Sequence, residues 1–326
     1  MTRRRVDLLF RVAAGPRLGF GHLVRAARLA RAAGIAAAPV SVRGNAGALE
    51  VARRLGLRPV AVSLAEALTR TGCRTLVVDD PGTSAARAAV ATARRQGVTT
   101  VSIHDLGIAP AGADFGIDGS AAPGRRRPGT RDSLLGLRYA ILDPRCDATP
   151  APAGRRRHVL VALGGGPRTA GAVALARAVA ARTEVPVVMA LGFGGASPGP
   201  LPPGVTSVGA RDGLIDLLRG AAVAVTAGGV TALEAAACAT PVVVTAVVAA
   251  QCPTVAALAR AGAAIDGGRF GRGRVEAIAT EVVRLLANAP RRAQMGRAGR
   301  DLVDGKGAAR VVDAIRRWQV SERTRT

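Results

Sequence analysis

Aromatic residues are scarce in this chain, at 2% of its 326 residues, with a single Trp and a single Tyr. Proteins that bind single-stranded nucleic acid stack the bases on aromatic side chains placed among basic ones. The chain has the basic residues, 46 Lys and Arg against 22 Asp and Glu for a net charge of +24, but not the aromatic ones. Because Lys306 is the single lysine, a compositional bias toward arginine explains this charge as well as a polyanionic partner does. No nucleic-acid partner is expected, whereas small molecules that carry phosphate remain compatible with the charge.

Closely spaced cysteines and histidines are also lacking. The four cysteines and three histidines are scattered, and no two cysteines form a Cys-x-x-Cys pair. These spacings do not match the usual zinc sites, so no metal or other cofactor is expected. They give no disulfide framework either, which indicates a cytoplasmic protein in a reducing compartment. The residues are Cys73, Cys146, Cys238, Cys252, His22, His104 and His158.

No hydrophobic run is long enough to predict a transmembrane segment. The basic residues Arg3–Arg5 precede an apolar run that Asp7 and Arg11 interrupt, so the run is too short for a signal peptide. The most apolar stretch, Ala221–Ala250, contains Glu234 together with glycine and proline. It is interpreted as a strand, a loop, a helix and a second strand rather than as a membrane span. Peripheral contact with a membrane through the arginines remains compatible with the sequence.

What the chain does contain is material for two folded domains. Hydrophobic residues make up 49% of it, and its length is roughly that of two domains of ~150 residues. Short runs of Val, Leu and Ile alternate with stretches rich in Ala, Arg and Leu, which is typical of parallel α/β sheets. A segment rich in Pro, Ala, Gly and Arg separates two such series. We therefore expect a first domain over residues 1–145, a linker over 146–157 and a second domain over 158–326, in a monomer or weak homo-oligomer.

The alternation predicts particular elements in each half. Strands are expected at residues 6–12, 59–62, 75–78, 99–103, 159–163, 187–191, 222–226 and 242–245. Helices are expected at residues 23–33, 84–96, 169–181, 231–238, 251–261 and 275–287, and in a tail over 291–320 that breaks near 305–307. Each half then forms a doubly wound sheet, in which ligands bind at the carboxyl ends of the strands.

The loop between the first strand and the first helix carries a candidate general base. Gly19 and Gly21 let the backbone turn tightly and let a ligand approach closely, and His22 follows at the helix N-terminus. The positive end of the helix dipole favours a neutral imidazole, which is suited to act as a base. Arg25 lies one turn further along the same helix face. On spacing alone, a histidine that only caps the helix explains the pattern equally well.

Two further glycine loops lie in the second half, each between a strand and a helix. Gly164–Gly166 and Gly228–Gly229 place backbone amides where a helix N-terminus binds phosphate. Thr231 adds a hydroxyl, and Glu234 is an acceptor for sugar hydroxyls. The structural alternatives are a tight turn at the first loop and, at the second, a capping box between Thr231 and Glu234.

Two carboxylates, Asp79 and Asp80, follow a predicted strand. A metal site needs further ligands, and no third ligand stands nearby in the sequence. A role in a loop or in binding sugar hydroxyls is therefore favoured over a metal site.

Phe10-Arg11, then Leu18-Gly19-Phe20-Gly21-His22, then Arg25 stand near the start of the chain in that order. This series resembles the opening signature of the UDP-2,4-diacetamido-2,4,6-trideoxy-β-L-altropyranose hydrolases of pseudaminic acid biosynthesis. That family shares a superfamily with the spore-coat polysaccharide proteins and the peptidoglycan N-acetylglucosaminyltransferase, all of GT-B fold. Further matches run almost end to end, at Val77–Asp79, Ser102–Asp105, Leu135–Leu142, Leu163–Gly166, Ala227–Glu234, Pro241, Gln251 and Gly262.

The resemblance implies two doubly wound Rossmann-like domains that face a central cleft, with the catalytic and acceptor site on the first and the nucleotide sugar on the second. His22 matches the base that activates water at the anomeric carbon of a nucleoside-diphosphate sugar. The loop at Gly228–Gly229 with Thr231 matches the diphosphate cradle, Glu234 an acidic residue near the ribose, and Gln251 a sugar contact. The full set of implied substrate-binding residues is Arg11, Gly19, Gly21, Arg25, Asp79, Gly164, Gly165, Gly228, Gly229, Thr231, Glu234 and Gln251.

Some positions depart from the family's pattern. Ala13 and Pro167 stand where the family usually has Asp, and Ala250 stands where it usually has Asn. These departures bear on the sugar rather than on the base or the phosphate loop. The main hypothesis is a UDP-sugar hydrolase of polysaccharide biosynthesis. The alternatives are a GT-B glycosyltransferase, in which His22 deprotonates an acceptor hydroxyl, and a nucleotide-sugar-binding protein without activity.

Overall fold

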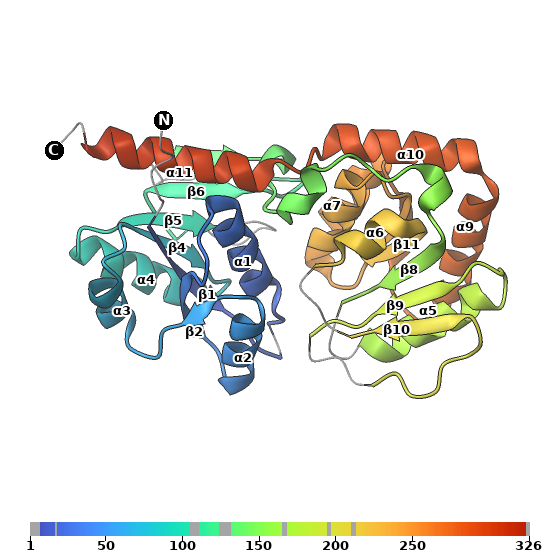
Figure 1. The fold of residues 1–326 in the computed structure, drawn as a ribbon, viewed down its shortest axis with the longest axis horizontal. Helices are drawn as coiled ribbons and strands as arrows, with labels where there is room; N and C mark the ends of the chain where they lie inside the picture. The colour runs from blue at the N-terminus through green and yellow to red at the C-terminus, as the bar shows by residue number, and fades with distance from the viewer. Residues whose placement is uncertain are drawn as a thin grey trace. The chain divides into compact units, whose positions relative to one another are not determined.

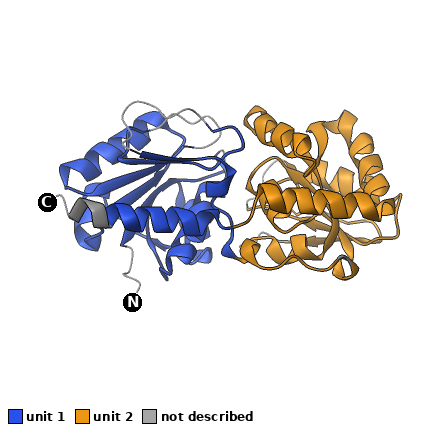
Figure 2. Ribbon diagram, turned by 90° about the horizontal axis from the view of Figure 1, so that it is seen from above, with its two compact units in different colours: residues 1–144, 306–326 blue, residues 145–305 orange. Residues whose placement is uncertain are grey.

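Strands and helices alternate along most of the chain and build two parallel β-sheets (Figure 1). The computed structural model describes residues 7–16, 18–104, 111–123, 132–164, 168–193, 197–209 and 213–323. The chain divides into two compact units, residues 1–144 with 306–326 and residues 145–305 (Figure 2). The predicted α/β fold with two doubly wound sheets is confirmed.

Unit 1 contains, among the described residues, a seven-stranded parallel sheet in the order β3-β2-β1-β4-β5-β6-β7. Its strands are β1 (Leu8–Ala13), β2 (Pro39–Arg43), β3 (Arg58–Pro59), β4 (Thr75–Asp79), β5 (Thr99–Ile103), β6 (Phe115–Asp118) and β7 (Asp132–Leu135). Its helices are α1 (Gly21–Ala33), α2 (Ala46–Arg54), α3 (Leu64–Thr71), α4 (Thr83–Arg95) and α11 (Gly307–Arg323), with a short 3-10 helix at Leu137–Tyr139.

The central strands of unit 1 are covered on both faces. Leu9 of β1 and Val78 of β4 belong to a core cluster with residues of α3 and α4. Side chains alternate across a strand, so Phe10 and Asp79 point to the opposite face, and His22 of α1 meets Asp79 there. Burial on both faces explains why β1 and β4 are nearly unbroken apolar runs.

Helix α11 closes unit 1 after the chain has passed through unit 2. It packs against α1 and buries Val311, Val312 and Ile315. The chain re-enters unit 1 at Lys306, and on the next residue, Gly307, a Cβ atom would collide with the carbonyl oxygen of Ala140, so only glycine fits there. The second domain was predicted to span residues 158–326. The structure differs over 306–326, because the apolar stripe of α11 is buried in unit 1.

Unit 2 contains, in the part of the chain described, a six-stranded parallel sheet in the order β10-β9-β8-β11-β12-β13. Its strands are β8 (His158–Ala162), β9 (Val187–Ala190), β10 (Val205–Val208), β11 (Ala221–Ala227), β12 (Val242–Ala246) and β13 (Ile265–Arg269). Its helices are α5 (Thr169–Ala180), α6 (Ile215–Gly220), α7 (Val230–Ala237), α8 (Cys252–Arg260), α9 (Val275–Ala287) and α10 (Ala289–Leu302). A core cluster joins valines of β8 and β11 to α5 and α9.

The predicted linker is folded onto unit 2 rather than extended. Residues from Arg145 onward belong to unit 2, and 3-10 turns form at Pro144–Asp147 and Ala153–Arg155. Arg300 donates hydrogen bonds to the backbone carbonyls of Cys146 at 2.6 Å and Asp147 at 3.0 Å. Contacts between an arginine and distant backbone carbonyls leave no periodic pattern in a sequence. For this reason the sequence predicts a linker here.

Each sheet has one point at which the order of its strands reverses. In unit 1 the reversal falls between β1 and β4, and in unit 2 it falls between β8 and β11. In open α/β sheets, ligands generally bind outside the carboxyl ends of the strands at such a point. In the described part of the chain, none of the helices combines the length and the apolar character needed to span a bilayer.

Candidate functional site

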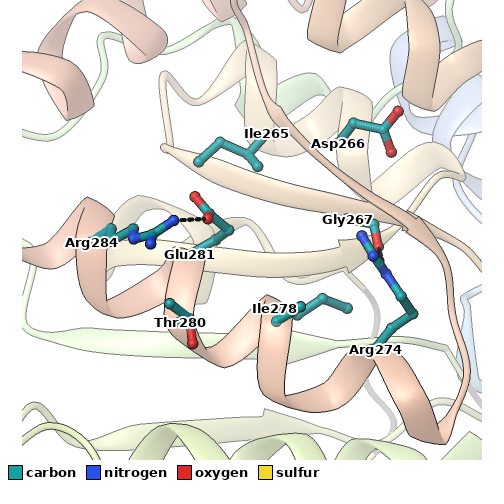
Figure 3. A pocket seen from close by; sticks show the side chains of 9 residues that line it. Ile265, Asp266, Gly267, Arg274, Ile278, Thr280, Glu281 and Arg284 are labelled. Carbon is teal, nitrogen blue, oxygen red and sulfur yellow. Dashed lines mark hydrogen bonds and ion pairs between the residues drawn. The ribbon is translucent and has the colours of Figure 1, made fainter.

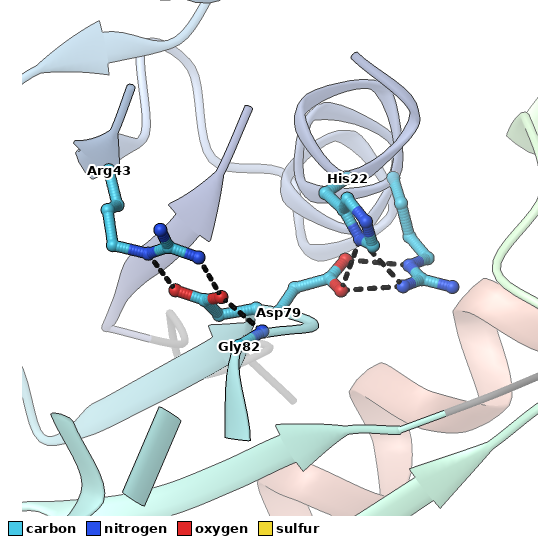
Figure 4. Close-up of polar contacts among 6 residues, drawn as sticks. His22, Arg43, Asp79 and Gly82 are labelled. Carbon is cyan, nitrogen blue, oxygen red and sulfur yellow. Dashed lines mark hydrogen bonds and ion pairs between the residues drawn. The ribbon is translucent and has the colours of Figure 1, made fainter. Parts of the chain in front are cut away.

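His22, Arg25 and Asp79 form a tight cluster at the reversal point of unit 1 (Figure 4). The Nδ1 atom of His22 lies 2.8 Å from Oδ1 of Asp79. Arg25 donates from Nε to Oδ2 of the same carboxylate at 2.7 Å and from Nη2 to Oδ1 at 2.6 Å. Asp79 is buried, while the His22 side chain keeps 17% of its surface exposed. The exposed member of the cluster is therefore the imidazole.

The protonation state of Asp79 decides how His22 is oriented. Burial by itself raises the pKa of Asp79, but the charge of Arg25 and the contact with His22 outweigh it and lower the pKa to about 2. An ionised carboxylate only accepts hydrogen bonds, so Nδ1 of His22 carries the proton of the 2.8 Å contact. In a neutral imidazole this leaves the lone pair on Nε2, which can then accept a proton from a substrate.

Asp79 and Arg25 contact each other in this arrangement. Both were predicted to bind substrate, which stays a prediction; the structure buries them against each other beside His22. Their contacts shown here run to each other and to His22. The sequence shows His22 and Arg25 one turn apart and an aspartate at the end of a strand. It does not show that Asp79 pairs with Arg25 and His22, which lie 54 and 57 positions away in the chain.

A second cluster lies at the same edge of the sheet and was not predicted as a unit. Arg43, the last residue of β2, donates to both carboxylate oxygens of Asp80, at 2.7 and 2.6 Å, and this bond raises the pKa of Arg43. The amide of Gly82 also donates to Asp80, at 2.8 Å (Figure 4). Arg11 of β1 donates from Nη1 to the hydroxyl of Ser41 at 2.9 Å. Adjacent aspartates thus hold His22 on one face of the sheet and Arg43 on the other.

The loop before α1 presents Gly19 and Gly21 as the sequence predicted. Gly15 and Gly19 exchange two backbone hydrogen bonds, at 3.1 and 2.7 Å, which pinches the loop into a small hairpin. Gly19 has a φ of 80°, which favours glycine there. Gly21 is exposed, and a Cβ atom on it would meet no atom within 4 Å. The backbone next to His22 is therefore open to a ligand.

In unit 2, the loop after β11 leads directly into α7. Gly228 donates its amide to Thr245 at the end of β12, at 2.9 Å, and Gly229 is the N-cap of α7 without a side-chain cap. The first amides of a helix have no partner within the helix, so those of Val230 and Thr231 are available to an anion. Thr231 is half-buried near this end of α7.

Gln251 packs directly against this loop. A Cβ atom on Gly228 would lie 2.8 Å from Cγ2 of Val255 and 3.1 Å from Cβ of Gln251, so α8 requires glycine here. The side-chain oxygen of Gln251 accepts a hydrogen bond from the amide of Val247 at 2.9 Å. Its Nε2 lies 3.6 Å from where a Cβ atom of Gly229 would be. The structure therefore brings Gln251 next to Gly228 and Gly229.

The structure removes one of the alternatives for Glu234. A capping box needs Thr231 at the N-cap, but the N-cap is Gly229 and Thr231 lies inside the helix. Glu234 is buried in α7, with 1% of its surface exposed. Gly164 is exposed after β8, at the reversal point beside the β11 loop, with a φ of 90°.

Several predicted residues lie outside the described part of the chain. They are Arg3–Arg5, Asp105, Gly165, Gly166 and Pro167.

A cavity of about 410 Å³ lies elsewhere in unit 2, between β13 and α9 (Figure 3). None of the predicted site residues lines it. Its charged groups bind partners within the protein: Arg284 pairs with Glu281 at 2.7 Å, and Asp266 accepts the amide of Gly268 at 2.7 Å. Arg274 donates to the carbonyl oxygen of Gly267 at 3.2 Å. We therefore place the candidate site at the strand ends rather than in this cavity.

With two doubly wound sheets in one chain, this protein has the GT-B fold. No family model and no curated protein matches the chain. Solved structures do match it over almost its whole length.

The spinosyn forosaminyltransferase SpnP is similar with 17% identity and a TM-score of 0.65, covering 97% of this chain and 99% of that one. The spinosyn rhamnosyltransferase SpnG, complexed with thymidine diphosphate, gives 17% identity, 94% and 99% coverage and a TM-score of 0.62. A putative UDP-N-acetylglucosamine 2-epimerase from Listeria monocytogenes gives 14% identity, 95% and 96% coverage and a TM-score of 0.57. At such identities the similarity establishes the fold, and the reaction has to be argued from the site.

Proposed function

We propose that this chain is a glycosyltransferase that uses a nucleoside-diphosphate sugar as its donor. The observation that carries the proposal is the pairing of partly exposed His22 with buried, ionised Asp79 at the strand-reversal point of unit 1. Two of the similar solved structures are sugar transferases, and one of them holds thymidine diphosphate. These comparisons favour transfer over the hydrolysis that the opening signature implies.

His22 is the base in the proposed reaction. Its Nε2 takes the proton from an acceptor hydroxyl while the oxygen of that hydroxyl bonds to the anomeric carbon of the sugar. Asp79 holds the ring in the productive tautomer and stabilises the imidazolium that forms. A positioned general base contributes about 10²–10⁴-fold to a rate.

The loop at Gly228–Gly229 receives the leaving group in this proposal. The bond between the anomeric carbon and the diphosphate oxygen breaks, and its electron pair leaves with the nucleoside diphosphate. Amides at the N-terminus of α7 and the positive end of its dipole stabilise the added charge. In this proposal Thr231 and Gln251, which lie near the loop, donate further hydrogen bonds to the sugar donor.

Transfer and hydrolysis differ only in the nucleophile, so the product decides between them. The purified protein is incubated with UDP- and TDP-linked sugars, with and without a panel of hydroxylated acceptors, and nucleoside diphosphate and free sugar are quantified. We expect nucleoside diphosphate to appear only with an acceptor. Free sugar released at the same rate without an acceptor would instead identify a hydrolase.

Variants test the base and its positioning. We expect His22→Asn to lower kcat by about 10²–10⁴-fold while the KM for the donor stays unchanged. Asp79→Asn should lower kcat to a similar extent, because an amide NH₂ can donate to Nδ1 and select the wrong tautomer. His158→Gln is the matched control, since His158 lies in unit 2 and bonds the carbonyl oxygen of Leu217 at 3.0 Å. Full activity of His22→Asn would refute the assignment of the base.

A further inference from the structure

Among the described residues, three arginines and two aspartates form the two clusters at the reversal point of unit 1. Asp79 binds Arg25 through both of its oxygens, and Asp80 binds Arg43 through both of its own. Arg11 is the third arginine, and its hydrogen bond goes to the neutral hydroxyl of Ser41. With a neutral His22, these five charged side chains carry a net charge of +1.

Arg11 is poorly satisfied for a half-buried cation. Its Nε atom is buried without a hydrogen-bond partner. Across the described residues, no carboxylate lies within ion-pair distance of it, and the charge of Asp80 acts on it only from further away. Burial lowers the pKa of Arg11, which reflects the cost of a desolvated guanidinium. Buried charges in proteins are normally paired. The guanidinium of Arg11, which has no ion pair among the described residues, therefore indicates a binding site for an anionic ligand.

The position of Arg11 indicates which ligand carries the anionic group. Arg11 lies on β1, beside β4, at the point where the strand order reverses. Strand alternation places Arg11 and Ser41 on one face of the sheet and Asp79, with His22, on the other face. A ligand seated over the carboxyl ends of β1 and β4 therefore has the base on one flank and Arg11 with Arg43 on the other. Arg43 keeps 40% of its side chain exposed.

We propose that the acceptor of this enzyme carries an anionic group, a carboxylate or a phosphate, which Arg11 binds with Arg43 beside it. This inference rests on the proposed function, in which unit 1 receives the acceptor. A planar guanidinium binds either anion through two parallel hydrogen bonds, and Nε is one of the two donors that such a bond uses.

Binding of simple probes tests the proposal without knowledge of the acceptor. Glucuronate, glucose 6-phosphate and glucose are titrated into the full-length protein by calorimetry at about 0.15 M salt, where long-range attraction to a basic surface is screened. Thymidine diphosphate is titrated in a parallel arm. The proteins are the wild type, Arg11→Met and Arg53→Met. Arg53 is the matched control, because it is an exposed arginine of the same unit whose ion pair is with exposed Glu50.

We expect the wild type and Arg53→Met to bind at least one anionic sugar tenfold or more tightly than glucose, and Arg11→Met to lose this preference. The affinity for thymidine diphosphate should be the same in all three proteins. Arg11→Met should also keep or raise the melting temperature, since it removes an unpaired charge, and Arg11→Lys should retain part of the preference.

Three results would overturn the proposal. They are equal affinities of the wild type for charged and neutral sugars, an unchanged preference in Arg11→Met, and a loss confined to thymidine diphosphate, which would assign the anion to the donor. Failure of the proposed function looks different. In that case the preference for anionic sugars depends on Arg11 as expected, but no nucleotide sugar is cleaved with any acceptor.

Discussion

At the scale of single residues, the buried carboxylate of Asp79 links the candidate site to the stability of the protein. Its pKa is about 2 in the folded chain, against an ordinary value of 3.8. A group whose pKa is lower when folded stabilises the protein above its unfolded pKa, and this contribution is lost as the pH falls through the folded value. The contribution of Asp79 is therefore complete above about pH 4 and disappears toward pH 2.

The first prediction follows from this window. Between about pH 4.5 and pH 2, the free energy of unfolding of the wild type should fall by about 2 kcal/mol more than that of Asp79→Asn. Denaturant unfolding at a series of pH values measures the difference between the two curves. Asp216→Asn is the control, because Asp216 keeps 85% of its side chain exposed and should give a curve parallel to the wild type. Parallel curves for Asp79→Asn as well would mean that Arg25 does not stabilise the ionised carboxylate.

A second prediction concerns Arg156, whose side chain ties the start of unit 2 to the end of α7. Its guanidinium donates to the carbonyl oxygens of Ala221, Cys238 and Ala239, each at 3.1 Å, and to the hydroxyl of Thr240 at 3.0 Å. Arg156→Met should lower the free energy of unfolding by about 2–4 kcal/mol, because several buried carbonyls lose a charged donor at once.

Arg157→Met is the matched control for this change. Arg157 is the next residue and its side chain is exposed, so its replacement should alter the free energy of unfolding by less than about 0.5 kcal/mol. Chemical denaturation of both variants gives the comparison. Equal effects of the two substitutions would show that the buried contacts of Arg156 add no stability.

At the scale of elements, α7 and α10 pack closely because glycines of α10 face α7. A Cβ atom on Gly296 would lie 2.7 Å from the carbonyl oxygen of Ala239, and one on Gly299 would lie 3.1 Å from atoms of Ala236. Gly296→Ala should cost about 1–3 kcal/mol through overpacking, against a gain of up to about 1 kcal/mol from helix propensity. The net prediction is a loss of about 1–2 kcal/mol.

Thermal or denaturant unfolding of Gly296→Ala tests this balance. Gly273→Ala is the control, because a Cβ atom there would meet no atom within 4 Å and should change stability little. A more stable Gly296→Ala variant would mean that α10 shifts away from α7 at no cost.

The strands differ in how well they could be predicted from the sequence. Continuous apolar runs predicted β4, β5 and β8 to within a residue or two, because strands buried on both faces need such runs. Strand β13 escaped prediction, because Gly267 and Gly268 interrupt it and its pairing with β12 is irregular. Strand β7 begins with an exposed aspartate and lies at the edge of its sheet. Edge strands have one neighbour to bury them and so a weaker pattern.

The candidate site was predictable in its parts but not in its pairings. His22 and the glycines near it stood out because loops between strands and helices bind ligands. That Asp79 contacts His22 depends on which strands are neighbours, and so does the pairing of Arg43 with Asp80. Neighbour relations are set by the packing of the whole sheet, so local sequence patterns do not contain them.

At the scale of the whole molecule, the two units have separate sheets and cores, so a ligand of one should stabilise that one. The single tryptophan, Trp318, lies in α11 and reports on unit 1 by fluorescence. We predict that thymidine or uridine diphosphate raises the unfolding temperature of unit 2, followed by circular dichroism, and leaves the tryptophan transition in place. The expected gain is about 2.7 kcal/mol at a ligand concentration of about 100 Kd.

A variant of the phosphate loop completes this test. Gly228→Val should abolish the nucleotide effect, since a side chain there collides with Val255 and Gln251. The control is His22→Asn, which lies in unit 1 and should keep the effect in full. A nucleotide that moves the tryptophan transition instead would assign nucleotide binding to unit 1.

Unit 2 is one uninterrupted stretch of chain, whereas unit 1 is assembled from two pieces, and the second piece is α11. During translation, every residue of unit 2 therefore leaves the ribosome before unit 1 has its last helix. Until that moment the surface of α1 that α11 covers is bare to water and open to chaperones. Damage to the codons for α11 would consequently harm a unit whose sheet is synthesised before unit 2.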